Sequence, residues 1–247
     1  MKRIISVFAA LCIFAAMLTC TASAAAERID LSHVYVELTA PDGFETMTPD
    51  NLAEHQKLLD YIDTTQEEMA KYMTSQYIEM FSMPLDKSCE LTLQVYKIND
   101  LNVFDLAQAK EKDLADIREN IENDANFTCN SLEIVDANES KFFRIERTDV
   151  AGLESISYVT VKNGANYALT LTKSNGEKLS QTDRDNIEFV FKSFSFTETL
   201  KDPSRYNWLA YILIAAIFVV AIAIIYVVIK RTKGWGDKSY SLKNRGK

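Results

Sequence analysis

The chain has 247 residues, a formal net charge of −8 at pH 7 and hydrophobic residues at 47% of its positions. That length allows one domain with a full hydrophobic core. Residues 230–247 carry seven Lys or Arg and one Asp, so the acidic excess lies in the rest of the chain. Because an acidic surface repels phosphate backbones, we expect no nucleic-acid partner.

The first segment is typical of a secretory signal peptide. Lys2 and Arg3 precede an apolar run, 4–18, and small residues follow with two Ala-x-Ala sites between Ala22 and Ala26. This pattern predicts a signal peptide over residues 1–26 that is removed, with the cleavage site left open between the two. A lipoprotein anchored through Cys20 is the alternative, although Thr19 occupies a position where Gly, Ala or Ser is usual.

Residues 27–204 form the predicted domain, which begins with a short β pattern. Val34, Val36 and Leu38 alternate with other residues, and Pro41-Asp42-Gly43 is turn chemistry, so a first hairpin is expected. Two helices follow, a short one over 52–62 and a second carrying Met69, Met73 and Met80 on one stripe. Methionines at this spacing can bind Cu(I), but core packing is favoured because no His or Cys joins them.

The middle of the domain predicts a strand and then a long helix. The strand is "CELTLQVYKI", and the helix places an apolar stripe over 103–121. Its charged face is interpreted as solvated. A Ca²⁺ site is the alternative, but the acidic residues lack the spacing of a dedicated calcium loop; they are Asp116, Glu119, Glu122 and Asp124.

Four β segments, a helix and a short strand complete the domain. The segments cover 131–137, 141–149, 155–164 and 167–176, with a hairpin turn at Asn163-Gly164. Ser180 and Asp183 predict the start of a helix whose apolar face includes Ile187 and Val190, and "FSF" predicts the last strand. The expected fold class is α+β, an antiparallel β-sheet covered by helices.

Cys89 and Cys129 are the two cysteines of this domain. Outside the cytoplasm they invite a disulfide, which would close a loop of some 40 residues and stabilise the fold by about 4 kcal/mol. The sequence alone does not decide between this disulfide and two buried free thiols.

Together these segments resemble a known family. "APDGF", the strand and helix of the middle, "VKNGANYALTLTKSNG" and "IEFVFKSFSF" are similar to the PsbP/Mog-like α/β/α family over residues 32–199. The family is named for a photosynthetic extrinsic subunit and a nuclear-transport factor. The resemblance implies an α/β/α sandwich that acts as a binding or assembly module of the cell envelope. It carries over no catalytic residue, cofactor or metal ligand.

Residues 205–230 predict a transmembrane helix with its flanks. The uncharged run 209–229 spans roughly 31 Å as a helix, the thickness of a hydrocarbon core, so membrane lipid is its expected partner. A buried helix of a soluble core is the alternative. Aromatic and basic residues expected at the membrane interfaces flank it: Tyr206, Trp208, Tyr211, Lys230, Arg231, Lys233 and Trp235.

The basic tail, 231–247, fixes the orientation. Basic flanks stay in the cytoplasm, so the acidic domain is expected outside a single-pass cell-membrane protein. Signalling through the tail is a further alternative, but the tail carries no recognisable domain.

No motif in the sequence indicates an enzyme. The only histidines, His33 and His55, lack metal-ligand spacing, and no nucleophile or phosphate-loop motif occurs. The leading hypothesis is therefore a membrane-anchored extracellular binding or assembly module with an envelope protein partner and no cofactor. The alternative is an envelope hydrolase or metal-dependent enzyme whose acidic site is assembled by the fold.

Overall fold

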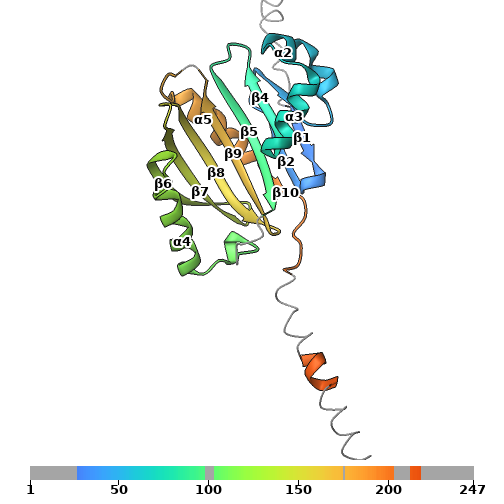
Figure 1. Cartoon of the computed structure of the whole chain (residues 1–247), viewed down its shortest axis with the longest axis vertical. Coiled ribbons are helices and arrows are strands. Elements are labelled where there is room, and N and C mark those ends of the chain that lie inside the picture. Colours follow the sequence, from blue (N-terminus) through green and yellow to red (C-terminus); the bar gives the residue numbers. More distant parts are fainter. Residues whose placement is uncertain (1–26, 98–102, 175, 203–211, 218–247) are drawn as a thin grey trace, which may run out of the picture. The chain divides into compact units, whose positions relative to one another are not determined.

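The computed structural model describes residues 27–97, 103–174, 176–202 and 212–217, within two compact units. The first unit, Met1–Leu200, contains an antiparallel seven-stranded sheet in the order β3-β4-β5-β9-β8-β7-β6 and a three-stranded sheet, β1-β2-β10 (Figure 1). The predicted α+β class with an antiparallel sheet is thus confirmed. The strands are β1 Arg28–Leu31, β2 Val36–Thr39, β3 Phe44–Met47, β4 Ile78–Pro84, β5 Cys89–Lys97, β6 Phe127–Ala137, β7 Ser140–Asp149, β8 Glu154–Lys162, β9 Ala165–Lys173 and β10 Ser195–Phe196.

Helices cover the large sheet unequally on its two faces. One face packs against α5 and the small sheet, and the other against α2 and α3 near β4 and against α4 near β6 and β7. On this second face, the middle strands β5, β9 and β8 lie between α3 and α4, and no described helix lies in front of them (Figure 1). The α-helices are α2 Gln56–Tyr61, α3 Gln66–Gln76, α4 Glu111–Glu122 and α5 Gln181–Ser193, and the 3₁₀ turns are η1 Ser32–Val34, η2 Leu52–His55 and η3 Leu106–Gln108.

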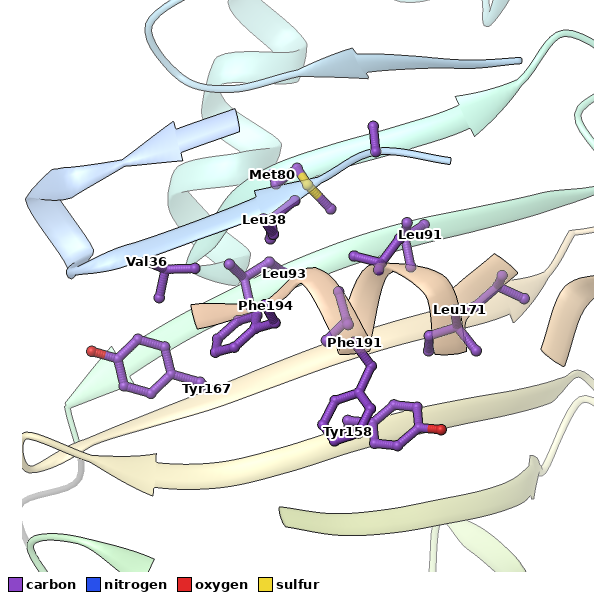
Figure 2. Packing of buried hydrophobic residues seen from close by; sticks show 14 of the residues in the cluster. Val36, Leu38, Met80, Leu91, Leu93, Tyr158, Tyr167, Leu171, Phe191 and Phe194 are labelled. Atoms are coloured by element: carbon purple, nitrogen blue, oxygen red, sulfur yellow. The ribbon is translucent and has the colours of Figure 1, made fainter. Parts of the chain in front are cut away.

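The main core lies under α5. Because successive strand side chains point to opposite faces, Leu91 and Leu93 of β5 point toward this core with Leu171 of β9. The Phe191 ring of α5 stacks on Tyr158 of β8, with centroids 3.9 Å apart (Figure 2). This packing closes one face of the sheet and leaves the other as the candidate functional face.

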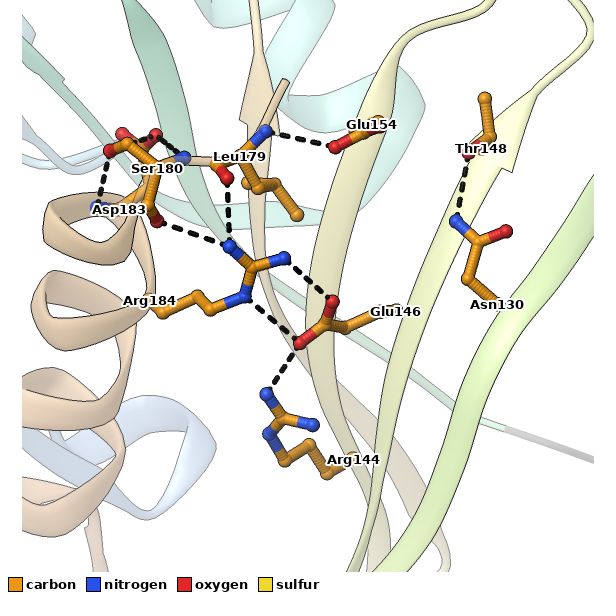
Figure 3. Close-up of polar contacts among 9 residues, drawn as sticks. All are labelled: Asn130, Arg144, Glu146, Thr148, Glu154, Leu179, Ser180, Asp183 and Arg184. Carbon is orange, nitrogen blue, oxygen red and sulfur yellow. Dashed lines mark hydrogen bonds and ion pairs between the residues drawn. The ribbon is translucent and has the colours of Figure 1, made fainter.

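Helix α5 begins as its sequence predicts. Ser180 Oγ accepts a hydrogen bond from the Asp183 backbone N–H, and the Asp183 carboxylate accepts one from the Ser180 backbone N–H. Arg184, in the first turn, then reaches across to Glu146 of β7 (Figure 3). The Ser180–Asp183 cap and the Arg184–Glu146 ion pair therefore stabilise α5 in its position over the main core.

The N-terminal part differs from the sequence-based expectation. The Pro41–Gly43 turn does not join two strands of one hairpin: β2 pairs with β1 and β10, whereas β3 pairs with β4. The turn therefore carries the chain from the small sheet to the large one, because β2 pairs with the preceding β1 and with the distant β10, whereas β3 pairs with β4.

The second helix and the long helix are shorter than predicted. Helix α3 ends at Gln76, where Tyr77 takes a left-handed conformation with φ 56°, and Met80 lies on β4. Met69 and Met73 are buried, which confirms core packing for these two methionines. Helix α4 begins at Glu111, and Leu106 belongs to η3, so the stripe predicted from Val103 is split between two elements.

The second unit, Lys201–Lys247, is described only at 201–202 and 212–217. Residues 212–217 are helical, apolar and exposed. Within the described part of the chain, no helix has the length and apolar character needed to span a membrane. The predicted signal peptide 1–26, the basic tail and most of the predicted transmembrane segment lie outside the described residues.

Candidate functional site

The uncovered face of the large sheet contains a trough. A cavity of about 380 Å³ lies over β5, β9, β8 and β7 and reaches α4, and a second of about 300 Å³ continues it toward Tyr72 of α3. The two cavities share Gln94, Arg147 and Thr170 in their linings. We call the two together the trough.

Strand alternation makes the trough floor small and polar. The β8 and β9 side chains on this face are Ser155, Ser157, Val159 and Val161, and Asn166, Ala168, Thr170 and Thr172. Ser157 Oγ and Thr170 Oγ1 lie 2.9 Å apart and are hydrogen-bonded. One of these hydroxyls donates to the other, which lowers the cost of keeping small polar groups on this part of the sheet.

One row of side chains crosses the trough from an acid to a base. Strand register aligns Glu90 of β5 with Thr172, Thr172 with Ser155, and Ser155 with Arg147 of β7. Three strand spacings separate the Cα atoms of Glu90 and Arg147 by roughly 14 Å, so the two charges do not pair. Burial without a cationic partner raises the pKa of the Glu90 carboxyl.

Arg147 has an unusual environment for an arginine. Its Nε donates to Ser155 Oγ at 3.3 Å, and its guanidinium lies over the Phe127 ring, 4.0 Å from the centroid. Within the described chain, no carboxylate oxygen lies within 4.0 Å of its nitrogens. Burial lowers the pKa of this guanidinium, although the group stays charged at neutral pH. Arg147 lines both cavities of the trough and a third, of about 60 Å³, beside them.

Of the carboxylates, Asp124 acts most strongly on the Arg147 guanidinium, where it opposes the lowering of the pKa by burial. It follows α4 and lines the first and third cavities with Arg147. Its Oδ1 accepts hydrogen bonds from the backbone N–H of Asn126 at 2.9 Å and from Asn126 Nδ2 at 3.0 Å. Asn126 therefore holds the carboxylate, which influences Arg147 through space without forming a direct ion pair.

The end of the trough beneath α4 is apolar. Phe143 and Ile145 of β7 are buried, and Ile117 and Ile121 of α4 pack against them. Tyr96 of β5 is 40% exposed at the opposite side of the same cavity. The trough thus joins an apolar end to a cationic position, the composition of a site for an amphipathic ligand.

The disulfide that the sequence left open is not formed in this structure. Cys89 and Cys129 are both free, Cys89 in the core under α5 and Cys129 beside the apolar end of the trough. They lie on β5 and β6, with β9, β8 and β7 between them, which is roughly 19 Å of sheet. A disulfide needs Cα atoms within about 7 Å, so this fold keeps the two thiols apart. Burial raises the pKa of the Cys89 thiol to about 11.

Other residues singled out in the sequence lie away from the trough or outside the described residues. His33 pairs with Glu79 at 2.8 Å and His55 lies 3.7 Å from Glu45. In the described ranges, no three His, Cys, Asp or Glu side chains are grouped to hold a metal ion. The predicted membrane-interface residues all lie outside the described residues: Tyr206, Trp208, Tyr211, Lys230, Arg231, Lys233 and Trp235.

Sequence reasoning did not select Arg147. A signal was available, because Arg147 shares strand parity with Phe143 and Ile145 in "FFRIERT" and so places a charge on an apolar face. The residues that interact with Arg147 come from other segments of the chain; they are Ser155, Phe127 and Asp124.

The fold and the trough define an α+β domain with one face closed by α5 and a cavity-bearing opposite face. No protein-family model matches the chain, and no curated protein matches it. Among solved structures it is similar to the solution structure of cyanobacterial PsbP (CyanoP) from Synechocystis sp. PCC 6803, with 13% identity and a TM-score of 0.42, over 69% of this chain and 91% of that chain. That structure is a PsbP, one of the two proteins for which the family resembled by residues 32–199 is named.

A second similar structure is a crystal structure from Bacteroides thetaiotaomicron VPI-5482. The identity is 9% and the TM-score 0.34, over 68% of this chain and 46% of that chain. At these identities the likeness concerns the fold alone, and no ligand, partner or activity follows from it.

Proposed function

We propose that this chain is a single-pass protein of the cell envelope that carries a binding or assembly module outside the membrane, with the trough as its binding surface. The trough itself supports the proposal: it combines about 380 Å³ of space, one pair of hydrogen-bonded hydroxyls on its floor and an arginine that has no carboxylate partner among the described residues. A concave, largely apolar site with a few convergent polar groups is the usual form of a ligand-binding site.

The membrane part of the proposal rests on the uncharged run 209–229 and the basic residues after it. The described piece of this run, 212–217, is helical with every side chain exposed, which suits a segment whose solvent is lipid. In this proposal the tail 231–247 is cytoplasmic and residues 27–204 are outside.

The side chains of the trough favour binding over catalysis. In the described chain, both histidines contact acidic residues elsewhere. Of the carboxylates that line the trough, Glu90 lies three strand spacings from Arg147, and Asp124 and Asp149 accept hydrogen bonds from backbone N–H groups. A hydrolytic site needs a nucleophile or a paired acid and base within reach of one reacting group. We therefore rank a binding module ahead of an envelope hydrolase or metal-dependent enzyme.

Site-specific photo-cross-linking in intact cells tests the trough. Benzoylphenylalanine replaces Tyr96, which lines the trough, and in a matched control it replaces Phe189 of α5, which is 45% exposed on the other side of the sheet. The proposal expects a reproducible adduct, to a small ligand or an envelope protein, at position 96 and none at 189. Equal adducts at both positions, or none at 96, contradict it.

The proposed topology has its own test. Protease added to whole cells is expected to digest residues 27–204, and a membrane-impermeant amine label is expected to spare the lysines of 231–247. Protection of the domain together with labelling of the tail from outside contradicts the membrane arrangement.

A further inference from the structure

We propose that the trough takes an amphipathic carboxylate, a ligand with one negative head group on Arg147 and an apolar body along Ile145 and Phe143 beneath α4. This inference rests on the proposed function, because it assumes that the trough is the binding surface.

Arg147 supplies the site for the head group. A guanidinium has five N–H donors, and in the described chain only that on Nε has a hydrogen-bond acceptor, Ser155 Oγ. Phe127 covers the guanidinium at 4.0 Å. The terminal Nη1 and Nη2 groups thus remain to bind a ligand where three cavities meet. Arg147 is partly buried. Because a charge that is partly removed from water gains from an opposite partner, and a carboxylate accepts two parallel N–H bonds from a guanidinium, an external carboxylate completes this site.

Asp124 opposes a negative head group. It lines two of the same cavities and interacts electrostatically with Arg147. Repulsion from Asp124 and attraction to Arg147 both scale with the ligand's charge, so Asp124 weakens the binding of any anion at Arg147. Removing the charge of Asp124 should therefore strengthen the binding of a carboxylate.

The apolar body follows β7 inward from Arg147. Ile145 and Phe143 lie two and four residues away on the same face, a run of roughly 13 Å, and they line the first cavity together with Ile117 and Ile121 of α4. An apolar chain laid across Ser157 and Thr170 breaks no hydrogen bond, because these hydroxyls bond each other. A peptide in the same place would need partners for its own N–H and C=O groups. An acyl chain ending in a carboxylate is thus the ligand class that fits best.

Photolabelling of the full chain in nanodiscs tests this class. The probes are a diazirine derivative of dodecanoate and the matching primary amide, which differ only in head-group charge, and labelled peptides are mapped by mass spectrometry. The carboxylate probe is expected to label 111–124 and 141–149 about tenfold more than the amide, the ratio for one charge-assisted contact. The segment 209–229 is expected to be labelled alike by both probes, which controls for partition into lipid.

Substitutions on the two charges give opposite expectations. Arg147→Gln is expected to lower carboxylate labelling of the trough to the amide level, and Asp124→Asn to raise it several-fold by removing repulsion. The Asp124→Asn gain cannot arise from misfolding, and the amide keeps its acceptor oxygen for Asn126. The inference is overturned if the carboxylate and amide probes label the trough equally and neither substitution changes the labelling.

The result separates this inference from the proposed function. If position 96 forms its adduct in cells but the dodecanoate probe does not label the trough selectively, the ligand class is wrong and the binding surface stands. If neither occurs, both fail.

Discussion

Arg184 of α5 holds the carboxylate of Glu146 on β7 with two hydrogen bonds, from Nε to Oε1 at 3.2 Å and from Nη2 to Oε2 at 2.9 Å (Figure 3). Arg144 Nη2 donates a third to Oε1 at 2.6 Å. Helix α5 covers the core on the face opposite the trough. The contact therefore joins this helix to β7, the strand that carries Arg147.

Glu146→Gln is expected to lower the free energy of unfolding by about 1.5–3 kcal/mol, the range for hydrogen bonds to charged groups. Urea denaturation measures it. Glu188→Gln is the matched control, because Glu188 forms only an exposed i,i+4 pair with Lys192 and is expected to cost no more than about 0.5 kcal/mol. Equal losses from both substitutions would show that the Glu146 contact contributes no more than a surface pair.

Lowering the pH is expected to reduce the difference in unfolding free energy between the unchanged protein and Glu146→Gln. Hydrogen bonds from Arg184 and Arg144 hold the pKa of Glu146 below its ordinary value of 4.5. The stabilisation is therefore fully present above pH 4.5 and is lost as pH falls through the lower pKa of the folded state. Urea midpoints of both proteins, measured from neutral pH downward, should converge in acid. A gap that widens on acidification contradicts this assignment.

Gly164→Ala is expected to destabilise the domain by about 1–3 kcal/mol, since alanine resists the left-handed conformation. Gly164 has φ 72°, and an added Cβ would lie 3.2 Å from the Phe104 ring. Gly152→Ala is the control, because Gly152 has φ 84° but nothing within 4 Å of the added Cβ. Thermal unfolding should show the larger loss for Gly164→Ala. A loss from Gly152→Ala that is as large would assign the whole effect to backbone conformation.

Cys129 is expected to react with maleimide in the native protein at pH 8, while Cys89 stays unmodified until denaturation. Cys89 is 1% exposed and its thiol pKa is raised to about 11 by burial, so it holds almost no thiolate, whereas Cys129 is only partly buried. Peptide mapping of the alkylated protein measures this. A peptide pair linked through Cys89 and Cys129 under non-reducing conditions would contradict the strand order itself.

The second half of the domain could be predicted because its signals are local. Asn163-Gly164 lies between two alternating runs that pair as β8 and β9, and Ser180 with Asp183 starts α5. Strand β4 was missed because Met80 continues the helical stripe of Met69 and Met73. The helix instead ends at Tyr77, a non-glycine residue with positive φ that the sequence does not mark as a stop.

The candidate site could not be predicted in the same way. The row from Glu90 to Arg147 depends on the pairing of β5 with β9, which joins Glu90 to Thr172 from a distant part of the chain, and on the register of the hairpins β9–β8 and β8–β7. Alternation predicts which side chains share a face within one strand. It does not predict which strands are neighbours or which face is left without a helix.

Blocking the trough tests the central claim most directly. Ala168 lies on the floor, 9% exposed, and Ala168→Trp places an indole in the cavity while the core side chains on the opposite face of β9 stay unchanged. The measurement is the yield of the cross-link at position 96 in intact cells, normalised to the amount of folded protein in the membrane. The account predicts that Ala168→Trp abolishes the adduct, and an undiminished yield would show that the trough is not the binding surface.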